Sequence, residues 1–82
     1  MASHVLLINC PDQPGLVFKI TGVLYKHNVN IISNGEFVER EFSYFFMRTA
    51  FSGDFDREEL LRDLHEALPE DGVEIRLTDM AK

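Results

Sequence analysis

A strand–helix–strand pattern occurs twice within 82 residues, and this repetition limits the folds open to the chain more than any other feature. Short apolar runs predict the strands, and apolar residues at spacings of three and four predict the helices. The expected elements are strands at His4–Cys10, Val29–Glu39, Tyr44–Phe51 and Val73–Leu77, with helices between Leu16 and Asn28 and between Asp56 and Pro69. This order, βαββαβ, indicates an α+β ferredoxin-like fold, with one four-stranded antiparallel sheet and both helices on one face.

Residues that favour turns mark the ends of the predicted elements. Pro14 suits a first helical turn because it has no N–H to lose, and Asp12 just before it can accept hydrogen bonds from free N–H groups. Asp56 and Glu59 have the spacing of a capping box at the second helix. Gly35, inside the second strand, predicts a β-bulge or a close approach by another backbone.

The third strand predicts what lies on each face of the sheet, because side chains alternate along a strand. The side chains expected to point into the core are Phe45, Met47, Thr49 and Phe51. Tyr44, Phe46 and Arg48 then lie on the open face, where solvent, a partner or a ligand must cover them.

Composition favours one domain over residues 1–82 and excludes several classes of partner. Apolar residues make up 45% of the chain, which suffices for a core, and the formal net charge is −6. Nucleic acid and anionic membrane surfaces are disfavoured as partners, because both need a basic patch. No apolar run approaches the ~20 residues of a membrane span. A single cysteine forms no internal disulfide, so we expect a protein of the reducing cytoplasm.

Three functions found on this fold need residues or charge that this chain lacks. Metal transfer needs a Cys-x-x-Cys pair in the first loop, but Gln13 stands three residues after Cys10. A phosphate-handling enzyme needs a basic residue in that loop, and no nucleophile is placed beside a base. RNA recognition could use Tyr44, Phe46 and Arg48, but the acidic charge opposes it. We therefore expect no catalytic residue, metal ligand or cofactor in this chain.

The loop Pro11–Gly15 fits a small zwitterion better than a phosphate. A helix start offers free N–H groups and the positive end of a dipole to a carboxylate. Asp12 can hold an ammonium group, and Gly15 lets a ligand approach the backbone. The same residues also have a structural interpretation, in which Asp12 caps the helix and Gly15 packs it against the sheet. The residues alone leave both interpretations open.

The segment from Cys10 to Ile31 resembles the ACT domain family, the amino-acid-sensing modules attached to metabolic enzymes. The family pattern runs from an apolar strand through an Asp/Asn-x-x-Gly turn and a helix to an Asn-Ile pair. The matching residues are Asp12, Pro14, Gly15, Leu16, Asn30 and Ile31. Together with the stretches Ser33–Val38, Phe45–Arg48 and Ala67–Glu70, nearly the whole chain resembles the ACT domains of the formyltetrahydrofolate deformylase family.

This resemblance implies a regulatory module that forms a homodimer through the sheet edge and binds an amino-acid effector at the seam. The effector-binding residues carried over by position are Asp12, Gly15, Leu16, Asn30 and Ile31. Asp12 and Asn30 would hold the amino and carboxylate groups, and the other three would add backbone contacts. Cys10 either lines the approach or is a buried core residue.

The same resemblance implies which effector and which enzyme to expect. Glycine or methionine would be the effector. The partner would be a formyltransferase-like catalytic domain, absent from these residues, that hydrolyses 10-formyltetrahydrofolate to tetrahydrofolate and formate for purine biosynthesis and one-carbon metabolism. Two alternatives stay open: a purely structural oligomerisation domain, and a free-standing ACT adaptor without an attached enzyme.

Overall fold

The computed structural model describes residues 3–69 and 71–79, and within them four strands and two helices follow in the predicted order. The elements are β1 (Ser3–Pro11), α1 (Leu16–Lys26), β2 (Asn30–Glu39), β3 (Tyr44–Ser52), α2 (Arg57–Ala67) and β4 (Glu74–Asp79). The strands form one antiparallel sheet in the order β2-β3-β1-β4. The ferredoxin-like fold is therefore confirmed. Glu70 and the predicted domain end at Lys82 lie outside the described residues.

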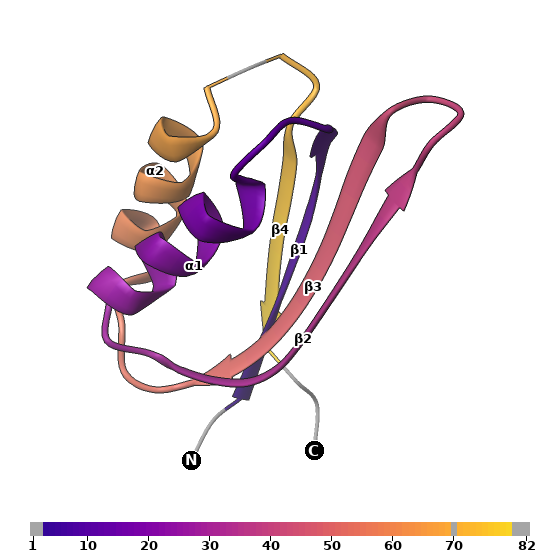
Figure 1. Ribbon diagram of the computed structural model, residues 1–82. Coiled ribbons are helices and arrows are strands. Elements are labelled where there is room, and N and C mark those ends of the chain that lie inside the picture. The colour runs from indigo at the N-terminus through magenta and orange to yellow at the C-terminus, as the bar shows by residue number, and fades with distance from the viewer. Residues whose placement is uncertain (1–2, 70, 80–82) are drawn as a thin grey trace.

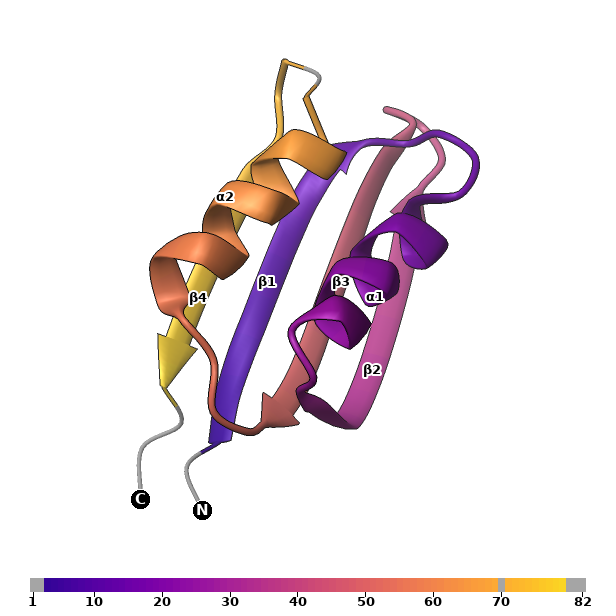
Figure 2. The same cartoon turned by 90° about the vertical axis from the view of Figure 1, so that its left-hand side faces the viewer.

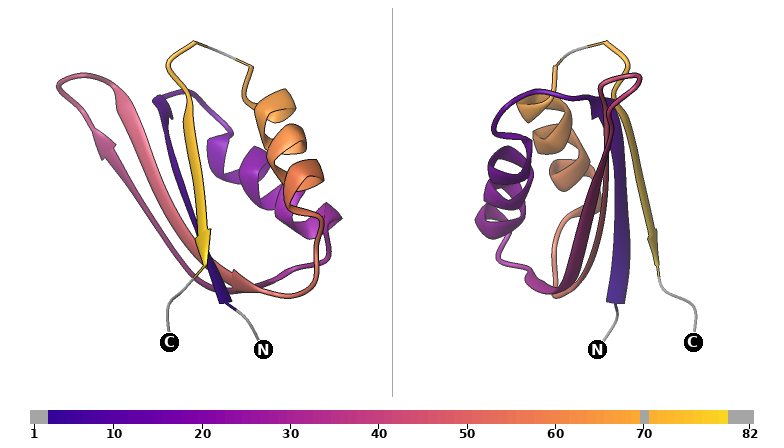
Figure 3. Two further views of the ribbon diagram at one scale, coloured as in Figure 1. Left: turned by 180° about the vertical axis from the view of Figure 1, so that it is seen from behind. Right: turned by 45° about the vertical axis from the view of Figure 1, so that its right-hand side comes forward.

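Both helices cover the same face of the sheet (Figure 1). α2 lies over β4 and β1, whereas α1 lies over the side of the sheet formed by β3 and β2 (Figure 2). The far end of the β2–β3 hairpin projects beyond the helices (Figure 3). No described element covers the opposite face, which leaves that face and one edge of the sheet accessible.

The core lies between the sheet and the helices, and apolar periodicity accounts for it. The four β3 side chains predicted to point inward are all buried, as are Leu16, Ile20 and Leu24 of α1 and Leu60 and Leu64 of α2. Full burial of one such side chain contributes about 1.5–3 kcal/mol. These two helix faces and one sheet face therefore supply most of the stability of the fold.

Two of the predicted element ends are confirmed. Asp56 is the N-cap of α2, and its carboxylate accepts a hydrogen bond from the backbone N–H of Glu59 at 3.1 Å. Asn28 has a positive φ of 62° and follows the end of α1 as a left-handed residue.

The prediction of a bulge or a close backbone contact at Gly35 is wrong. The irregularity in β2 lies between Ile31 and Ser33, where Ile32 has no partner on β3. Gly35 pairs regularly with Arg48, and a Cβ at Gly35 would meet nothing within 4 Å. A glycine in a strand fits either arrangement, so its presence alone does not locate a bulge.

β2 is an edge strand with little cover on either side. Its residues Asn30–Val38 are all exposed, including the apolar side chains of Ile31, Ile32, Phe37 and Val38. An edge of this length presents unpaired backbone N–H and C=O groups that another strand can bind.

Candidate functional site

The loop between β1 and α1 is held against the turn between β2 and β3. The backbone N–H of Asp12 donates to the carbonyl oxygen of Ser43 at 2.8 Å. Gly15 then turns the chain into α1 with a φ of 81°, a conformation that strains any residue with a Cβ. A Cβ at Gly15 would meet nothing within 4 Å, so the predicted packing of Gly15 against the sheet is wrong. The glycine is needed for its backbone conformation.

The first turn of α1 has no side-chain cap. The N-cap is Gly15, and no acidic residue lies in the first turn. The predictions that Pro14 lies in the helix and that Asp12 caps it are therefore wrong, because the left-handed turn at Gly15 separates both from α1. The N–H groups at the start of α1 thus lack a side-chain acceptor from this loop.

Asp12 and Asn30 are both exposed, and neither side chain forms a hydrogen bond or ion pair within the described part of the chain. They lie at opposite ends of the sheet. Pro11, next to Asp12, pairs with Tyr44, whereas Asn30 pairs with Ser52 at the other end of β3. The intervening strand spans roughly 26 Å at about 3.3 Å per residue. One chain cannot bring these two side chains to the same ligand.

The other predicted site residues also fall into two groups, one near Asp12 and one near Asn30. Leu16 lies with Asp12 and Gly15, but its side chain is buried in the core, so only its backbone can meet a ligand. Ile31 lies with Asn30 and is partly exposed. Cys10 is 0% exposed and belongs to the core cluster, which favours its interpretation as a core residue over a lining of the approach.

One acidic side chain that sequence spacing did not reveal joins the two helices. Asp63 on α2 lies 2.7 Å from Nε2 of His27 and 3.5 Å from Nζ of Lys26. The hydrogen bond with His27 is the main cause that lowers the pKa of Asp63, while desolvation opposes it and Lys26 adds to it. The contact lies at the C-terminal end of α1, away from the Pro11–Gly15 loop. It holds the helices together and adds nothing to the candidate site.

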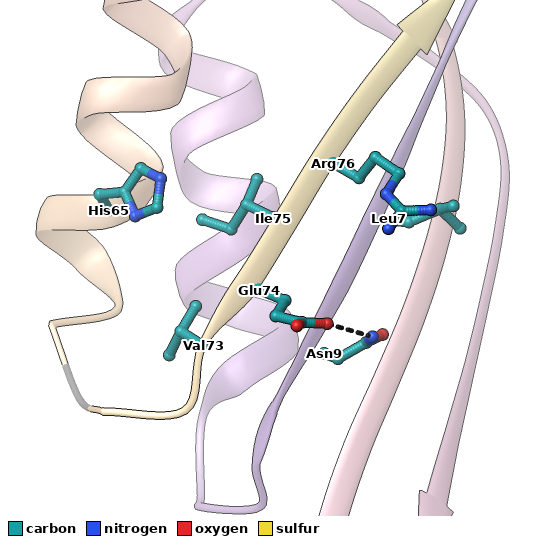
Figure 4. A pocket seen from close by; sticks show the side chains of 7 residues that line it. All are labelled: Leu7, Asn9, His65, Val73, Glu74, Ile75 and Arg76. Atoms are coloured by element: carbon teal, nitrogen blue, oxygen red, sulfur yellow. Dashed lines mark hydrogen bonds between the residues drawn. The ribbon is translucent and has the colours of Figure 1, made fainter.

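A hollow of about 490 Å³ lies along β4 (Figure 4). His65, Val73 and Ile75 lie on the helix side of this edge strand, whereas Glu74 and Arg76 lie on the open side with β1 residues. The Asn9 amide donates to Glu74 at 3.4 Å. The hollow therefore extends around the edge of the sheet, and its polar groups do not converge on one point.

The described residues contain no group of three or more side chains that could hold a metal ion. Among the same residues, neither helix is long and apolar enough to cross a membrane.

Known proteins resemble this chain in sequence and in fold. The sequence profile of the ACT domain matches residues 4–69. The formyltetrahydrofolate deformylase of Haemophilus influenzae is 51% identical over 67 residues, covering 82% of this chain and 24% of that protein. The Escherichia coli K12 deformylase is 51% identical over 69 residues, covering 84% of this chain and 25% of that protein.

A crystal structure of a formyltetrahydrofolate deformylase from Pseudomonas syringae superposes with a TM-score of 0.84 at 28% identity, covering all of this chain and 28% of that one. The chain thus spans about a quarter of the length of the curated relatives it matches. The ACT profile matches residues 4–69, and the order of strands and helices is that of the ferredoxin-like fold. The chain therefore belongs to the ACT domain family.

Proposed function

We propose that this chain is a regulatory module that binds a small amino acid at the seam of a two-fold dimer. The observation that carries the proposal is the position of the two half-sites: Asn30 begins the exposed strand β2, and the Pro11–Gly15 loop is bonded to the turn that follows the other end of β2. If β2 pairs antiparallel with β2 of a second copy, the start of one strand lies beside the end of the other. Asn30 of the partner subunit then lies near the Pro11–Gly15 loop.

Each half-site supplies groups for one part of a zwitterion. The uncapped start of α1 offers N–H groups and the positive end of the helix dipole to a carboxylate. The exposed carboxylate of Asp12 can accept from an ammonium group, and the amide of Asn30 can both donate and accept. No basic side chain in the loop competes for Asp12.

The exposed β2 edge supports the dimer independently of any effector. Its apolar residues are Ile31, Ile32, Phe37 and Val38, and a neighbouring copy would bury part of this surface. This observation also favours the second candidate, a structural oligomerisation domain that binds no amino acid.

We further propose that the module serves a cytoplasmic formyltetrahydrofolate deformylase. The 51% identity to two such proteins supports this role, and so does a single buried cysteine for a reducing compartment. Effector binding would favour one arrangement of the paired domains and so bias the catalytic domain by population shift. Glycine and methionine are the effectors to test first. Reading the coding sequence after Lys82 tests for the catalytic domain, and a stop codon there would contradict this role.

Mixing two inactive variants tests the shared site. Asp12→Ala and Asn30→Ala should each abolish the thermal shift with glycine or methionine, which for the parent is worth roughly 2.7 kcal/mol at ~100 times the dissociation constant. The seam of a two-fold dimer contains two equivalent sites, and in a mixed dimer one site carries both substitutions while the other carries neither. Mixing the variants should therefore restore binding with up to half the parent's number of sites, measured by calorimetry.

Glu66→Ala, which removes an exposed acid on α2, is the matched control and should leave binding unchanged. Binding that the mixture fails to restore would show that the site is not shared across a two-fold axis. A parent dimer that binds neither amino acid would support the structural oligomerisation domain instead.

A further inference from the structure

Two neighbouring rows of side chains cross the open face of the sheet. The strand registers place Gly35, Arg48, Leu7 and Arg76 side by side in the first row. The second row, nearer the Pro11–Gly15 loop, contains Phe37, Phe46, Asn9 and Glu74 in the same strand order. We call these the arginine row and the phenylalanine row.

The arginine row contains two cations without an ion-pair partner among the described residues. Arg48 and Arg76 are exposed, and neither forms an ion pair with another described residue. Figure 4 shows Arg76 reaching across β1 toward Leu7. A hollow of about 360 Å³ lies across both rows, lined by Gly35 and Arg48 on one side and by Phe37 and Phe46 on the other.

The phenylalanine row contains the opposite features. Phe37 is 63% exposed and stands beside Phe46, with their ring centroids 6.1 Å apart. Glu74 on β4 is exposed and holds only the weak contact from Asn9 at 3.4 Å. The arginine row thus has two exposed cations, and the phenylalanine row has the aromatic rings and a carboxylate.

We propose that a second copy of the chain covers this face, with its sheet stacked on the first about a two-fold axis that crosses the strands between the two rows. Such an axis places each strand of one copy over the same strand of the partner subunit, and the two strands are antiparallel. The arginine row of one copy then faces the phenylalanine row of the other. The occupant of the open face is therefore the chain itself.

Three of the four facing pairs match in charge or in size, and on β1 the apolar Leu7 lies opposite the amide of Asn9 of the partner subunit. Arg76 lies opposite Glu74 of the partner subunit, and the two-fold axis repeats this ion pair. Phe37 of the partner subunit lies over the hollow at Gly35. Arg48 lies over the ring of Phe46 of the partner subunit, a cation–π arrangement. In the flanking rows, the small Ala50 faces Tyr44 of the partner subunit.

Other symmetric stackings do not match. An axis parallel to the strands would place Arg76 over Gly35 of the partner subunit, and Phe37 over Glu74 of the partner subunit. Stacked sheets pack about 10 Å apart and rotated by about 30°. The long side chains of Arg76 and Glu74 can bridge the displacement that this rotation causes at the sheet edge.

This inference uses the face of the sheet, whereas the proposed amino-acid site uses the β2 edge, so neither depends on the other. A chain that uses both surfaces forms assemblies larger than a dimer, and these close as a tetramer when the two two-fold axes intersect. If the face contact is lost, the edge dimer should still form. Mixing Asp12→Ala with Asn30→Ala should then still restore amino-acid binding. Loss of the edge contact would leave a dimer that responds to the charges on β4.

Charge reversal on β4 tests the stacking. Arg76→Glu places two acids opposite each other, and Glu74→Arg places two arginines opposite each other. Each variant should weaken association by about tenfold or more in sedimentation equilibrium at low salt. The double variant Arg76→Glu/Glu74→Arg should restore association to within about threefold of the parent, as should an equimolar mixture of the two single variants.

Filling the hollow gives a second test. Gly35→Leu should weaken association by about tenfold or more, because Phe37 of the partner subunit needs that space, while the Cβ of the new side chain meets nothing within 4 Å in the monomer. Gly22→Leu, also on an open surface but on α1, is the matched control and should leave association unchanged. Single reversals that associate like the parent, a double variant without restoration, or a parent that stays monomeric on the order of 100 µM would each overturn the proposal.

Discussion

β1, α1 and β2 form one half of the molecule, β3, α2 and β4 form the other, and the two helices bury similar faces. The outer faces differ. α1 exposes two aromatic side chains, Phe18 at 80% and Tyr25 at 86%. The exposed residues of α2 are polar, among them Glu58, Arg62 and Glu66. The outer face of α2 is therefore suited to solvent, whereas the outer face of α1 leaves apolar surface exposed.

The two halves also differ in how their helices begin and in how exposed their edge strands are. α2 begins with a carboxylate cap and two glutamates in its first turn, but α1 begins with a glycine and no acid. β4 is a six-residue edge that alternates charged and apolar side chains, whereas β2 is a ten-residue edge exposed along nearly all its length. The helix cap and the polar helix surface lie in the second half, whereas the uncapped helix start and the long exposed edge lie in the first.

The largest test asks whether the two helices are equally anchored. Leu24→Ala on α1 and Leu60→Ala on α2 each remove a fully buried side chain and should each lower the free energy of unfolding by about 2–5 kcal/mol. Urea denaturation measures both. Phe18→Ala is the control on the exposed face and should stay within about 0.5 kcal/mol of the parent. A much smaller cost at Leu24 would show that α1 is only loosely docked.

The next test compares two glycines of the first half. Gly15→Ala should destabilise the chain by roughly 1–2 kcal/mol because its φ is positive. Gly22→Ala should stabilise it by about 0.5–1 kcal/mol, since alanine favours the interior of an exposed helix. Both positions have room for a Cβ, so opposite signs in thermal denaturation isolate the effect of backbone conformation. Equal signs would contradict the left-handed turn.

A third test compares the acids that precede the two helices. Asp56→Ala should cost about 1 kcal/mol because it removes the cap on the Glu59 N–H. Asp12→Ala should change stability by less than about 0.5 kcal/mol, because its side chain has no partner within the described chain. The denaturant midpoints of the two variants measure both stability changes. A loss at Asp12 as large as that at Asp56 would mean that Asp12 supports the fold and would weaken its assignment to a ligand.

The smallest expected effect concerns the contact between the two halves at Asp63, and it depends on pH. The lowered pKa of Asp63 means that its carboxylate stabilises the fold above the ordinary carboxyl pKa of about 3.9. This stabilisation is lost as pH falls through the lowered value. Asp63→Asn should therefore melt below the parent at neutral pH, and the two melting temperatures should converge in acid. Glu66→Gln is the exposed control on α2. A difference at Asp63 that persists below both pKa values would exclude the ionised contact as its cause.

The fold was predictable because alternation and helical spacing record which face of each element is buried. The inward β3 residues and the cap at Asp56 followed from local rules that the structure confirms. The start of α1 at Leu16 was predicted, but the roles of Pro14 and Asp12 were not, because a single left-handed glycine separates both from the helix. The contact between His27 and Asp63 joins residues 36 apart in sequence, and no local pattern announces it.

The candidate site was predictable only in its parts. The residues near Asp12 and Asn30 follow from the family pattern, but their separation across the sheet follows only from the strand register. The match between the arginine and phenylalanine rows likewise needs the alignment of four strands, which no single strand sequence contains. Local sequence therefore identified candidate residues, and topology decides which of them can act together.

The bulge at Ile32 has a consequence for how chain length can vary. Ile31 pairs with Phe51 and Ser33 pairs with Ala50, so the sheet already connects the residues on either side of Ile32 without it. Deleting Ile32 would leave every later residue of β2 opposite its present neighbour and on its present face. Position 32 is thus a point where related chains can gain or lose one residue while Asn30 and the distant hairpin both keep their places.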